Sequence, residues 1–300
     1  MRKFCLILIV LLVAPIGFAK QLCAIDDNGI KVCLHSAPKR IISLAPSATE
    51  LLYAAGAGKQ LVAVDKYSDF PEAAKKLPKV GGYPNINAEV LVNMAPDLIV
   101  VWAGGNSPEL IQQIARMKLK LFQLNAVNLK DIGIELRKLG AITGNVQQAN
   151  FQADRFDRRL ARLQTTYQHQ TPISVFFEIW HTPLMAVGAD NIMNRVITLC
   201  GGRNIFADVK IHFPIVSIES LLAKNPDVIL ITSPQNKARD RQTLIASYQK
   251  KWVMLSAVQK KQLFIIDSDM ISRPTPRILD GAEKICQYLK VVRENKYIKH

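Results

Sequence analysis

The sequence predicts an α/β fold of two lobes, each with a mainly parallel sheet, joined by a long rigid helix and enclosing a ligand cleft. Predicted strands and helices alternate along most of the chain, which is typical of α/β proteins. One helix, turn and strand segment occurs twice, and a long polar helix separates the two copies. The 300 residues are 49% hydrophobic and 21% charged. This ordinary globular composition excludes disordered and collagen-like chains.

The first residues predict a secretory signal peptide over 1–19. Arg2 and Lys3 precede an apolar run at 4–18, and 17–19 has the small residues of a cleavage site. An uncleaved membrane anchor is the alternative, although this run is shorter than the ~20 apolar residues that span a bilayer. We therefore expect an exported protein.

The chain is strongly basic. Its formal charge is 39 − 24 = +15, and loss of the two basic signal residues leaves 15 − 2 = +13. Such a charge suggests an anionic partner or surface. A nucleic-acid partner is not expected, because the sequence has no basic stripe with interleaved aromatic residues and export argues against it.

Four cysteines remain after removal of the signal, an even number that suits an oxidising compartment. Cys23 and Cys33 each lie five positions from Asn28, whose Asn-Gly pair predicts the turn of a hairpin over 20–36. These two should therefore form one disulfide, which leaves Cys200 and Cys286 for the second. A metal site is the alternative, but the sequence has no Cys-x-x-Cys pair.

An N-terminal α/β lobe is predicted over 37–145. Ser47 and Glu50 match a capping box, which predicts a helix from Ser47 to Gly56. Strands are expected at 40–46, 61–65, 98–102 and 121–125, and further helices at 89–94, 108–118 and 129–139.

A connecting helix is predicted over 146–170, because 147–169 contains neither Gly nor Pro. Phe151, Phe156, Leu160 and Leu163 recur at helical spacing and predict its apolar face. A surface helix of one large domain is the alternative. The C-terminal lobe follows over 171–300, with strands at 174–180, 228–232 and 263–267 and helices at 191–199, 218–225, 241–250 and 276–292.

The repeated segment supports two related lobes. Residues 89–100 and 219–230 share a pattern of Glu, Leu, Pro-Asp and an apolar strand at a constant offset of 130. Each copy is one helix-to-strand step of a parallel sheet. Two such lobes predict a cleft between them, where small-molecule ligands preferentially bind.

The sequence contains no catalytic motif, so we expect a protein that is not an enzyme. It lacks the phosphate loop, the nucleophile elbow and the dinucleotide fingerprint. Histidines at 35, 169, 181, 212 and 300 have no metal-ligand spacing, so no metal site is expected. A secreted two-lobed hydrolase is the alternative from another functional class.

Aromatic and small residues gather where the predicted strands end, the edge at which α/β lobes bind ligands. Four aromatic side chains there are suited to stacking on a large planar ligand. Asp269 and Arg273 add polar groups, which an internal ion pair would explain equally well. The candidate ligand-binding residues are Pro46, Ser47, Tyr67, Trp102, Gly104, Gly105, Trp180, Phe213, Asp269, Met270 and Arg273.

Five segments resemble the class III substrate-binding proteins of ABC importers, over roughly 38–292. They are 43–50, 67–71, 96–106, 200–206 and 272–277. The first segment and the Pro-Asp-Leu-Ile run at 96–99 are shared with carriers of siderophores and haem. Segments 67–71 and 102–106 and the pair of Cys200 and Cys286 are more particular to cobalamin carriers.

The resemblance implies a periplasmic protein that holds a corrin ring in its cleft and delivers it to an inner-membrane ABC permease with its ATPase. Cobalamin would be the transported ligand, no cofactor is implied, and the free protein is expected to be a monomer. Trp stands in the family where this chain has Phe213 and Met270, which reduces the stacking area. Haem or a ferric siderophore is the alternative ligand, with Tyr67 as a haem ligand. The residues at corrin-contacting positions are Pro46, Ser47, Tyr67, Trp102, Phe213 and Asp269.

The resemblance also implies docking on the permease through one carboxylate of each lobe, paired with arginines of the transporter. Glu219 matches the C-terminal position directly. In the N-terminal lobe the family's Glu falls opposite Pro108, so Glu109 is our choice. Glu89 is the alternative that the internal repeat suggests.

Overall fold

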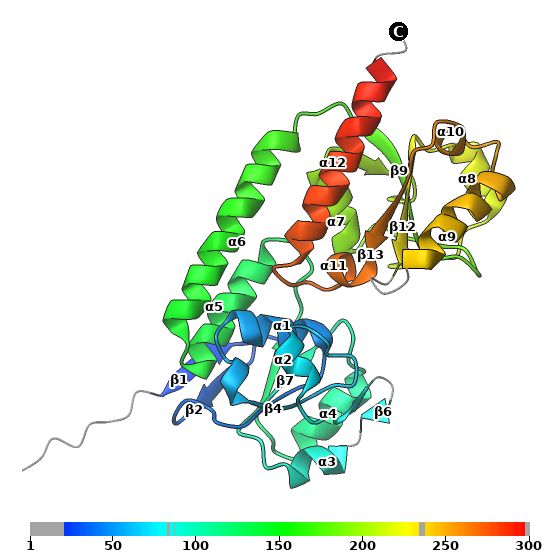
Figure 1. Ribbon diagram of the computed structural model, residues 1–300. Helices are drawn as coiled ribbons and strands as arrows, with labels where there is room; N and C mark the ends of the chain where they lie inside the picture. The colour runs from blue at the N-terminus through cyan, green and yellow to red at the C-terminus, as the bar shows by residue number, and fades with distance from the viewer. Residues whose placement is uncertain (1–20, 83–84, 87, 234–237, 298–300) are drawn as a thin grey trace, which may run out of the picture.

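The computed structural model describes residues 21–82, 85–86, 88–233 and 238–297, and the predicted signal peptide lies outside them. The chain forms two α/β lobes, and helices α6 and α12 run side by side along one flank (Figure 1). No helix in the part of the chain described here is long and apolar enough to cross a membrane.

An N-terminal hairpin precedes the lobes. Strands β1 (Leu22–Ile25) and β2 (Lys31–Leu34) pair antiparallel and place Cys23 opposite Cys33, which form a disulfide. Gly29 takes the left-handed conformation that the turn requires, with φ +79°. An ion pair between Asp27 and Lys138 of helix α5 ties the hairpin to the N-terminal lobe.

The N-terminal lobe contains a parallel sheet with the strand order β4 (Leu61–Val64), β3 (Ile41–Ser43), β7 (Leu98–Trp102) and β8 (Leu121–Leu124). Helices α1 (Pro46–Ala54) and α5 (Asp131–Thr143) pack on one face, and α3 (Ala88–Asn93) and α4 (Pro108–Arg116) pack on the other. Successive residues of β7 enter opposite cores, which is why this strand is apolar throughout. Short elements at the lobe's edges are a 3₁₀ turn (Gly58–Gln60), α2 (Glu72–Lys75), β5 (Gly81–Gly82) and β6 (Asn85–Ile86).

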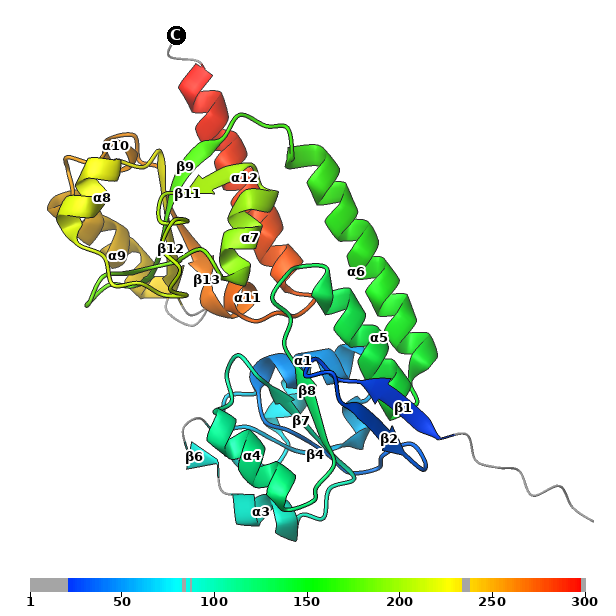
Figure 2. The ribbon, with the colours of Figure 1, turned by 180° about the vertical axis from the view of Figure 1, so that it is seen from behind.

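The C-terminal lobe repeats this plan. Its sheet has the order β10 (Met185–Ala186), β9 (Ile173–Trp180), β12 (Val228–Ser233) and β13 (Leu263–Asp267), and β11 (Gly202–Asn204) also pairs with β9. Only β10 is antiparallel among these pairings. Helices α7 (Ile192–Leu199) and α12 (Ile278–Tyr297) cover one face, while α8 (Ile218–Lys224), α9 (Ala238–Lys251) and α10 (Ser256–Gln259) cover the other (Figure 2).

The internal repeat has a physical basis in both lobes. Asp97 Oδ2 accepts hydrogen bonds from the backbone N–H groups of Lys39 and Arg40, just before β3. Asp227 Oδ2 accepts equivalent bonds from the N–H and hydroxyl of Ser174, at the start of β9. Each Pro-Asp turn therefore ties the start of one strand, β7 or β12, to the start of the neighbouring strand with which it pairs, β3 or β9, as two related lobes require.

Helix α6 (Val146–Tyr167) passes from one lobe to the other, and its buried side chains belong to a single apolar core that continues into both. Phe156, Leu160 and Leu163 lie in this core, as their spacing predicts. The prediction for Phe151 is wrong, because its side chain is 57% exposed and the small Ala149 and Ala153 lie on the buried face instead. The connection is therefore a packed layer shared by the two lobes.

Two other local predictions are wrong. Helix α1 begins at Pro46 with no side-chain cap, so Ser47 and Glu50 do not form a capping box. The chain after β13 forms the short helix α11 (Ser268–Ser272), so Asp269 and Met270 lie on a helix and not in a loop. Glu50 binds arginines of the opposite lobe, and Asp269 pairs with Arg273 one helical turn further along. A local motif does not reveal either contact.

Candidate ligand-binding cleft

Glu50 of α1 joins the two lobes at the inner end of the space between them. Its carboxylate is 4% exposed and accepts hydrogen bonds from Arg277 Nε at 2.9 Å and from Arg277 Nη2 at 2.7 Å. Arg273 Nη1 lies 2.9 Å from Oε1, and the hydroxyl of Thr275 donates to Oε2 at 3.0 Å. One buried carboxylate thus binds two guanidinium groups of the C-terminal lobe, a bidentate geometry that is strong and orientationally specific.

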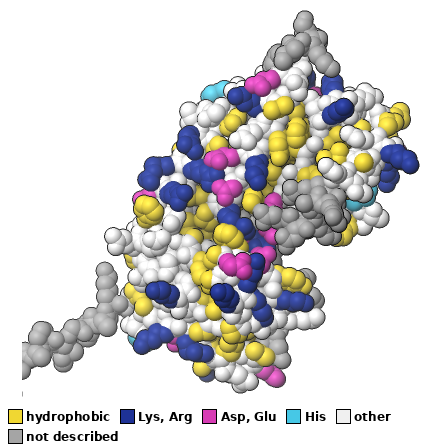
Figure 3. Space-filling view, viewed as in Figure 1, with side chains coloured by type: hydrophobic (Ala, Val, Ile, Leu, Met, Phe, Trp, Pro, Cys, Tyr) yellow, Lys and Arg dark blue, Asp and Glu magenta, His cyan; other side chains and the backbone are white. Residues whose placement is uncertain are grey.

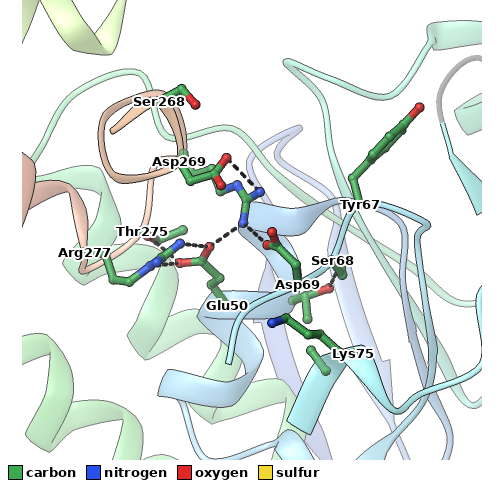
Figure 4. Close-up of polar contacts among 12 residues, drawn as sticks. Glu50, Tyr67, Ser68, Asp69, Lys75, Ser268, Asp269, Thr275 and Arg277 are labelled. Atoms are coloured by element: carbon green, nitrogen blue, oxygen red, sulfur yellow. Dashed lines mark hydrogen bonds and ion pairs between the residues drawn. The ribbon is translucent and has the colours of Figure 1, made fainter. Parts of the chain in front are cut away.

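The loop that carries Tyr67 is held against the C-terminal lobe by two further contacts. Asp69 Oδ1 lies 2.7 Å from Arg273 Nη1, and the guanidinium of Arg277 lies 3.8 Å from the centre of the Phe70 ring. Figure 3 shows acidic and basic side chains next to one another where the lobes meet. The loop at 67–70 and helix α11 therefore face each other across the cleft, as Figure 4 shows.

Tyr67 is 53% exposed and projects into the space between the lobes (Figure 4). A buried polar network fixes its backbone: Asp65 Oδ2 accepts from the Tyr67 N–H at 2.9 Å, and the same carboxylate binds the hydroxyl of Ser68. Ser68 in turn contacts Thr49 of α1 at 2.7 Å. Gly82 adjoins the ring, since a Cβ there would lie 2.8 Å from Tyr67 Cε2.

Trp102 ends strand β7 and is partly buried. A Cβ on Gly104 would lie 2.8 Å from its Cζ2 atom, and one on Gly105 would lie 2.4 Å from Cε3. Asn106 Oδ1 accepts from the Trp102 N–H, and Asn106 Nδ2 donates to the Leu44 carbonyl, both at 2.9 Å. The two glycines therefore allow the loop to fold against the indole, which gives them a structural role that their assignment as ligand contacts did not include.

Three apolar candidates of the C-terminal lobe are accessible. Trp180 is 62% exposed and donates its indole N–H to the Thr182 carbonyl at 2.9 Å, while Phe213 is 38% exposed and lies beside a surface pocket of about 620 Å³. Met270 lies half-buried on α11. Trp180 and Phe213 are therefore accessible from solvent, and Met270 is partly accessible.

Asp269 and Arg273 form an internal ion pair at 3.0 Å, the alternative that the sequence left open. Burial raises the pKa of Asp269, against the opposing charge of Arg273. Burial also acts to lower the pKa of Arg273, but Asp69 and Glu50 outweigh it and the pKa is raised. Arg273 therefore keeps its charge and is largely occupied by carboxylates of this chain.

Pro46 is half-buried at the start of α1. Ser47 is 2% exposed, and its hydroxyl has no hydrogen-bond partner among the described residues. In this conformation Ser47 is covered, so of these two candidates Pro46 alone is accessible.

Both candidate docking residues are exposed in the first turn of a helix with a serine N-cap. Glu109 is an exposed side chain in the first turn of α4, whose N-cap Ser107 accepts from the Leu110 N–H. Glu219 is exposed in the first turn of α8, whose N-cap Ser217 accepts from the Ser220 N–H. Hydrogen bonds from its own N–H and from Ser217 lower the pKa of Glu219, so it stays ionised. Glu89 is also exposed, in the first turn of α3.

The site residues that the sequence did not single out are Glu50, Asp69 and Arg277. Their partners are more than 200 positions away in the chain, so no local pattern could have identified their contacts. Within the described residues, no group of three His, Cys, Asp or Glu side chains is arranged to hold a metal ion.

The description "Periplasmic binding protein" belongs to the family model that matches residues 41–270. The chain belongs to this family. The match covers both lobes and α6, from β3 to α11. The chain is 37% identical to the vitamin B12-binding protein of Vibrio cholerae over 85% of this chain and 91% of that protein. It is 34% identical to the vitamin B12-binding protein of Photorhabdus laumondii over 85% of this chain and 90% of that protein.

Solved structures of periplasmic binding proteins show the same architecture. The crystal structure of the periplasmic vitamin B12-binding protein of Vibrio cholerae superimposes with a TM-score of 0.78 at 36% identity, covering 85% of this chain and 98% of that one. The periplasmic haem-binding protein of Roseiflexus sp. RS-1 matches with a TM-score of 0.75 at 22% identity, covering 86% and 99% of the two chains. At that identity the second likeness shows the fold alone.

Proposed function

We propose that this chain is the periplasmic binding component of an ABC importer, and that it captures cobalamin between its lobes for delivery to the permease. Cobalamin would be the transported ligand, and the protein would perform no catalysis. The observation that carries the proposal is the 37% identity to a vitamin B12-binding protein over 85% of the chain.

The accessible side chains suit a large planar ligand. Three aromatic side chains are more than one-third exposed: Tyr67 on one lobe, and Trp180 and Phe213 on the other. Aromatic rings add large apolar contact area at a low cost in conformational entropy. A corrin ring, which is planar and carries apolar faces, would be held between them.

The permease would bind the exposed carboxylates Glu109 and Glu219. Each lies in the first turn of a helix that runs antiparallel to its sheet, so both lie on the side toward which the strands point. The charge of 15 − 2 = +13 that remains after removal of the signal peptide requires local acidic positions if arginines of a transporter are the partners, since charges beyond about 8 Å are largely screened.

The test is calorimetric titration of residues 20–300 with cyanocobalamin, with haem as the competing titrant. We expect submicromolar one-to-one binding of cobalamin that weakens at least about tenfold in Trp102→Ala. Phe151→Ala is the control, because Phe151 is an exposed aromatic residue on α6 and is not a candidate ligand contact. Tight haem binding without cobalamin binding would keep the fold and overturn this function.

A further inference from the structure

A second cavity lies inside the C-terminal lobe, between α9 and the carboxyl ends of β9 and β12. We call it the α9 pocket. Its volume is about 570 Å³, within the range of small-molecule sites. Trp180 lies at its rim, Ile231 and Leu244 form apolar walls, and Ser247 lines it from the exposed face of α9. The pocket therefore opens at the same sheet edge that faces the cleft.

A chain of hydrogen-bonded polar side chains, formed by Tyr248, Glu178 and His181, lies at the floor of this pocket. Glu178 is 2% exposed, and its Oε2 accepts a hydrogen bond from the hydroxyl of Tyr248. Its Oε1 lies 3.3 Å from His181 Nδ1. The His181 ring also packs against Tyr248 and Trp252, with centroid distances of 5.3 and 5.8 Å. Because burying polar groups is costly, such a chain inside an apolar lobe points to a use beyond packing.

Glu178 and His181 are both uncharged at neutral pH. Burial raises the pKa of Glu178 to about 8, with Lys251 opposing the shift. Burial and Lys251 both lower the pKa of His181. A protonated Glu178 donates to His181 Nδ1, which leaves the ring proton on Nε2 as a hydrogen-bond donor. None of the described side chains that line the pocket is a cation.

We propose that the α9 pocket receives an edge of the bound macrocycle and selects neutral amide arms over carboxylates. An amide carbonyl accepts from a neutral donor without a charge penalty. A carboxylate would lose its hydration in an apolar cavity beside Glu178. This inference rests on the proposed function. It would distinguish corrinoids, whose periphery carries amides, from haem, whose periphery carries propionates.

The test compares cyanocobalamin with its isomeric monocarboxylic acids, each made by hydrolysing one propionamide arm. We expect at least one acid to bind the unmodified protein at least about tenfold more weakly than cyanocobalamin at pH 6.5. Ser247→Phe should fill the pocket and weaken cyanocobalamin binding about tenfold or more. Ala246→Phe, on the neighbouring exposed position of α9, should not. Thermal unfolding of both variants shows that they fold.

A pH series supplies a second readout that does not depend on filling the pocket. Between pH 6.5 and 9 Glu178 ionises, so the discrimination against the sensitive acid should grow further. Glu178→Gln, which places a neutral group there at every pH, should remove that growth. The charged and titratable groups that act on this site are Glu178, His181, Tyr248 and Lys251.

The outcomes separate the two proposals. Cyanocobalamin binding with equal affinities for all the acids, and with Ser247→Phe equal to Ala246→Phe, would overturn the α9 pocket as a selector and leave the proposed function intact. A pH-independent ratio that Glu178→Gln does not change would also overturn it. Absence of cyanocobalamin binding to the unmodified protein would overturn both.

Discussion

Arg277 of the C-terminal lobe donates two hydrogen bonds to the carboxylate of Glu50 in the N-terminal lobe, at 2.7 and 2.9 Å. Arg273 and Thr275 bind the same carboxylate, so α1 is joined to the segment between α11 and α12. Together with the apolar core that continues through α6, this contact holds the lobes at the inner end of the cleft. A motion that opens the cleft must therefore either preserve the contacts of Glu50 or carry the energetic cost of breaking them.

Glu50→Gln should destabilise the protein by about 3 kcal/mol, because it removes the buried carboxylate that pairs with Arg277 and leaves Arg273 only the more exposed Asp69 and Asp269. Urea unfolding followed by circular dichroism measures the loss. Glu72→Gln is the control: Glu72 pairs with Lys75 at 2.8 Å but its side chain is 76% exposed, so less than about 1 kcal/mol is expected. Equal effects of the two changes would show that the cluster contributes no special stability.

Gly105→Ala should weaken cobalamin binding about tenfold, because the new Cβ would force the Trp102 ring to move. In a Trp102→Ala background the same substitution should have little further effect, since the clash is gone. The comparison is a double-mutant cycle read by calorimetry. Additive losses in the double variant would indicate that Gly105 acts independently of the indole.

Removing the Cys200–Cys286 disulfide by a double Ala substitution should cost about 4 to 5 kcal/mol in the chain-entropy model, because it closes a separation of 86 residues. The same change at Cys23 and Cys33, which are 10 positions apart, should cost about 3 kcal/mol. Urea unfolding of the two variants measures the difference. A larger loss at the hairpin would contradict the loop-length argument.

Glu109→Arg and Glu219→Arg should each abolish association with the permease and leave the cobalamin affinity unchanged, since both side chains are exposed and neither is among the candidate ligand contacts. Binding to the purified transporter in lipid nanodiscs measures the first effect, and titration measures the second. Glu72→Arg controls for the charge change. If Glu89→Arg abolishes association and Glu109→Arg does not, the assignment in the N-terminal lobe moves to Glu89.

Glu178 should make the protein less stable as pH rises from about 4.5 to about 8. The native state retains a proton there that the unfolded chain releases, because burial raises the pKa from 4.5 to about 8. The loss is at most about 1.4 kcal/mol for each pH unit in that window. Glu178→Gln should flatten this part of the stability profile, measured by urea unfolding between pH 4.5 and 9. An unchanged slope would show that Glu178 ionises normally.

The elements most faithfully predicted from sequence are those whose pattern reflects local geometry. The turn at Asn28-Gly29 and the two Pro-Asp segments recur in the structure because turns and strand starts satisfy their hydrogen bonds within a few residues or with the neighbouring strand. The failures at Phe151 and at the supposed capping box have one cause. Helical spacing and cap motifs do not say which face another element will cover or which distant group will bind a side chain.

The sequence by itself determined the α/β class, the repeated helix and strand step, the long connecting helix and the aromatic residues at strand ends, because each follows from periodicity or short-range spacing. Only the tertiary structure decided that Glu50 binds Arg273 and Arg277, that Gly104 and Gly105 adjoin the Trp102 indole, and that Glu178, His181 and Tyr248 meet below the α9 pocket. The first and last of these depend on side chains brought together from distant parts of the chain. The contact of the two glycines depends on how their loop folds back over the Trp102 ring. All three arrangements follow from the way complete helices and strands pack together.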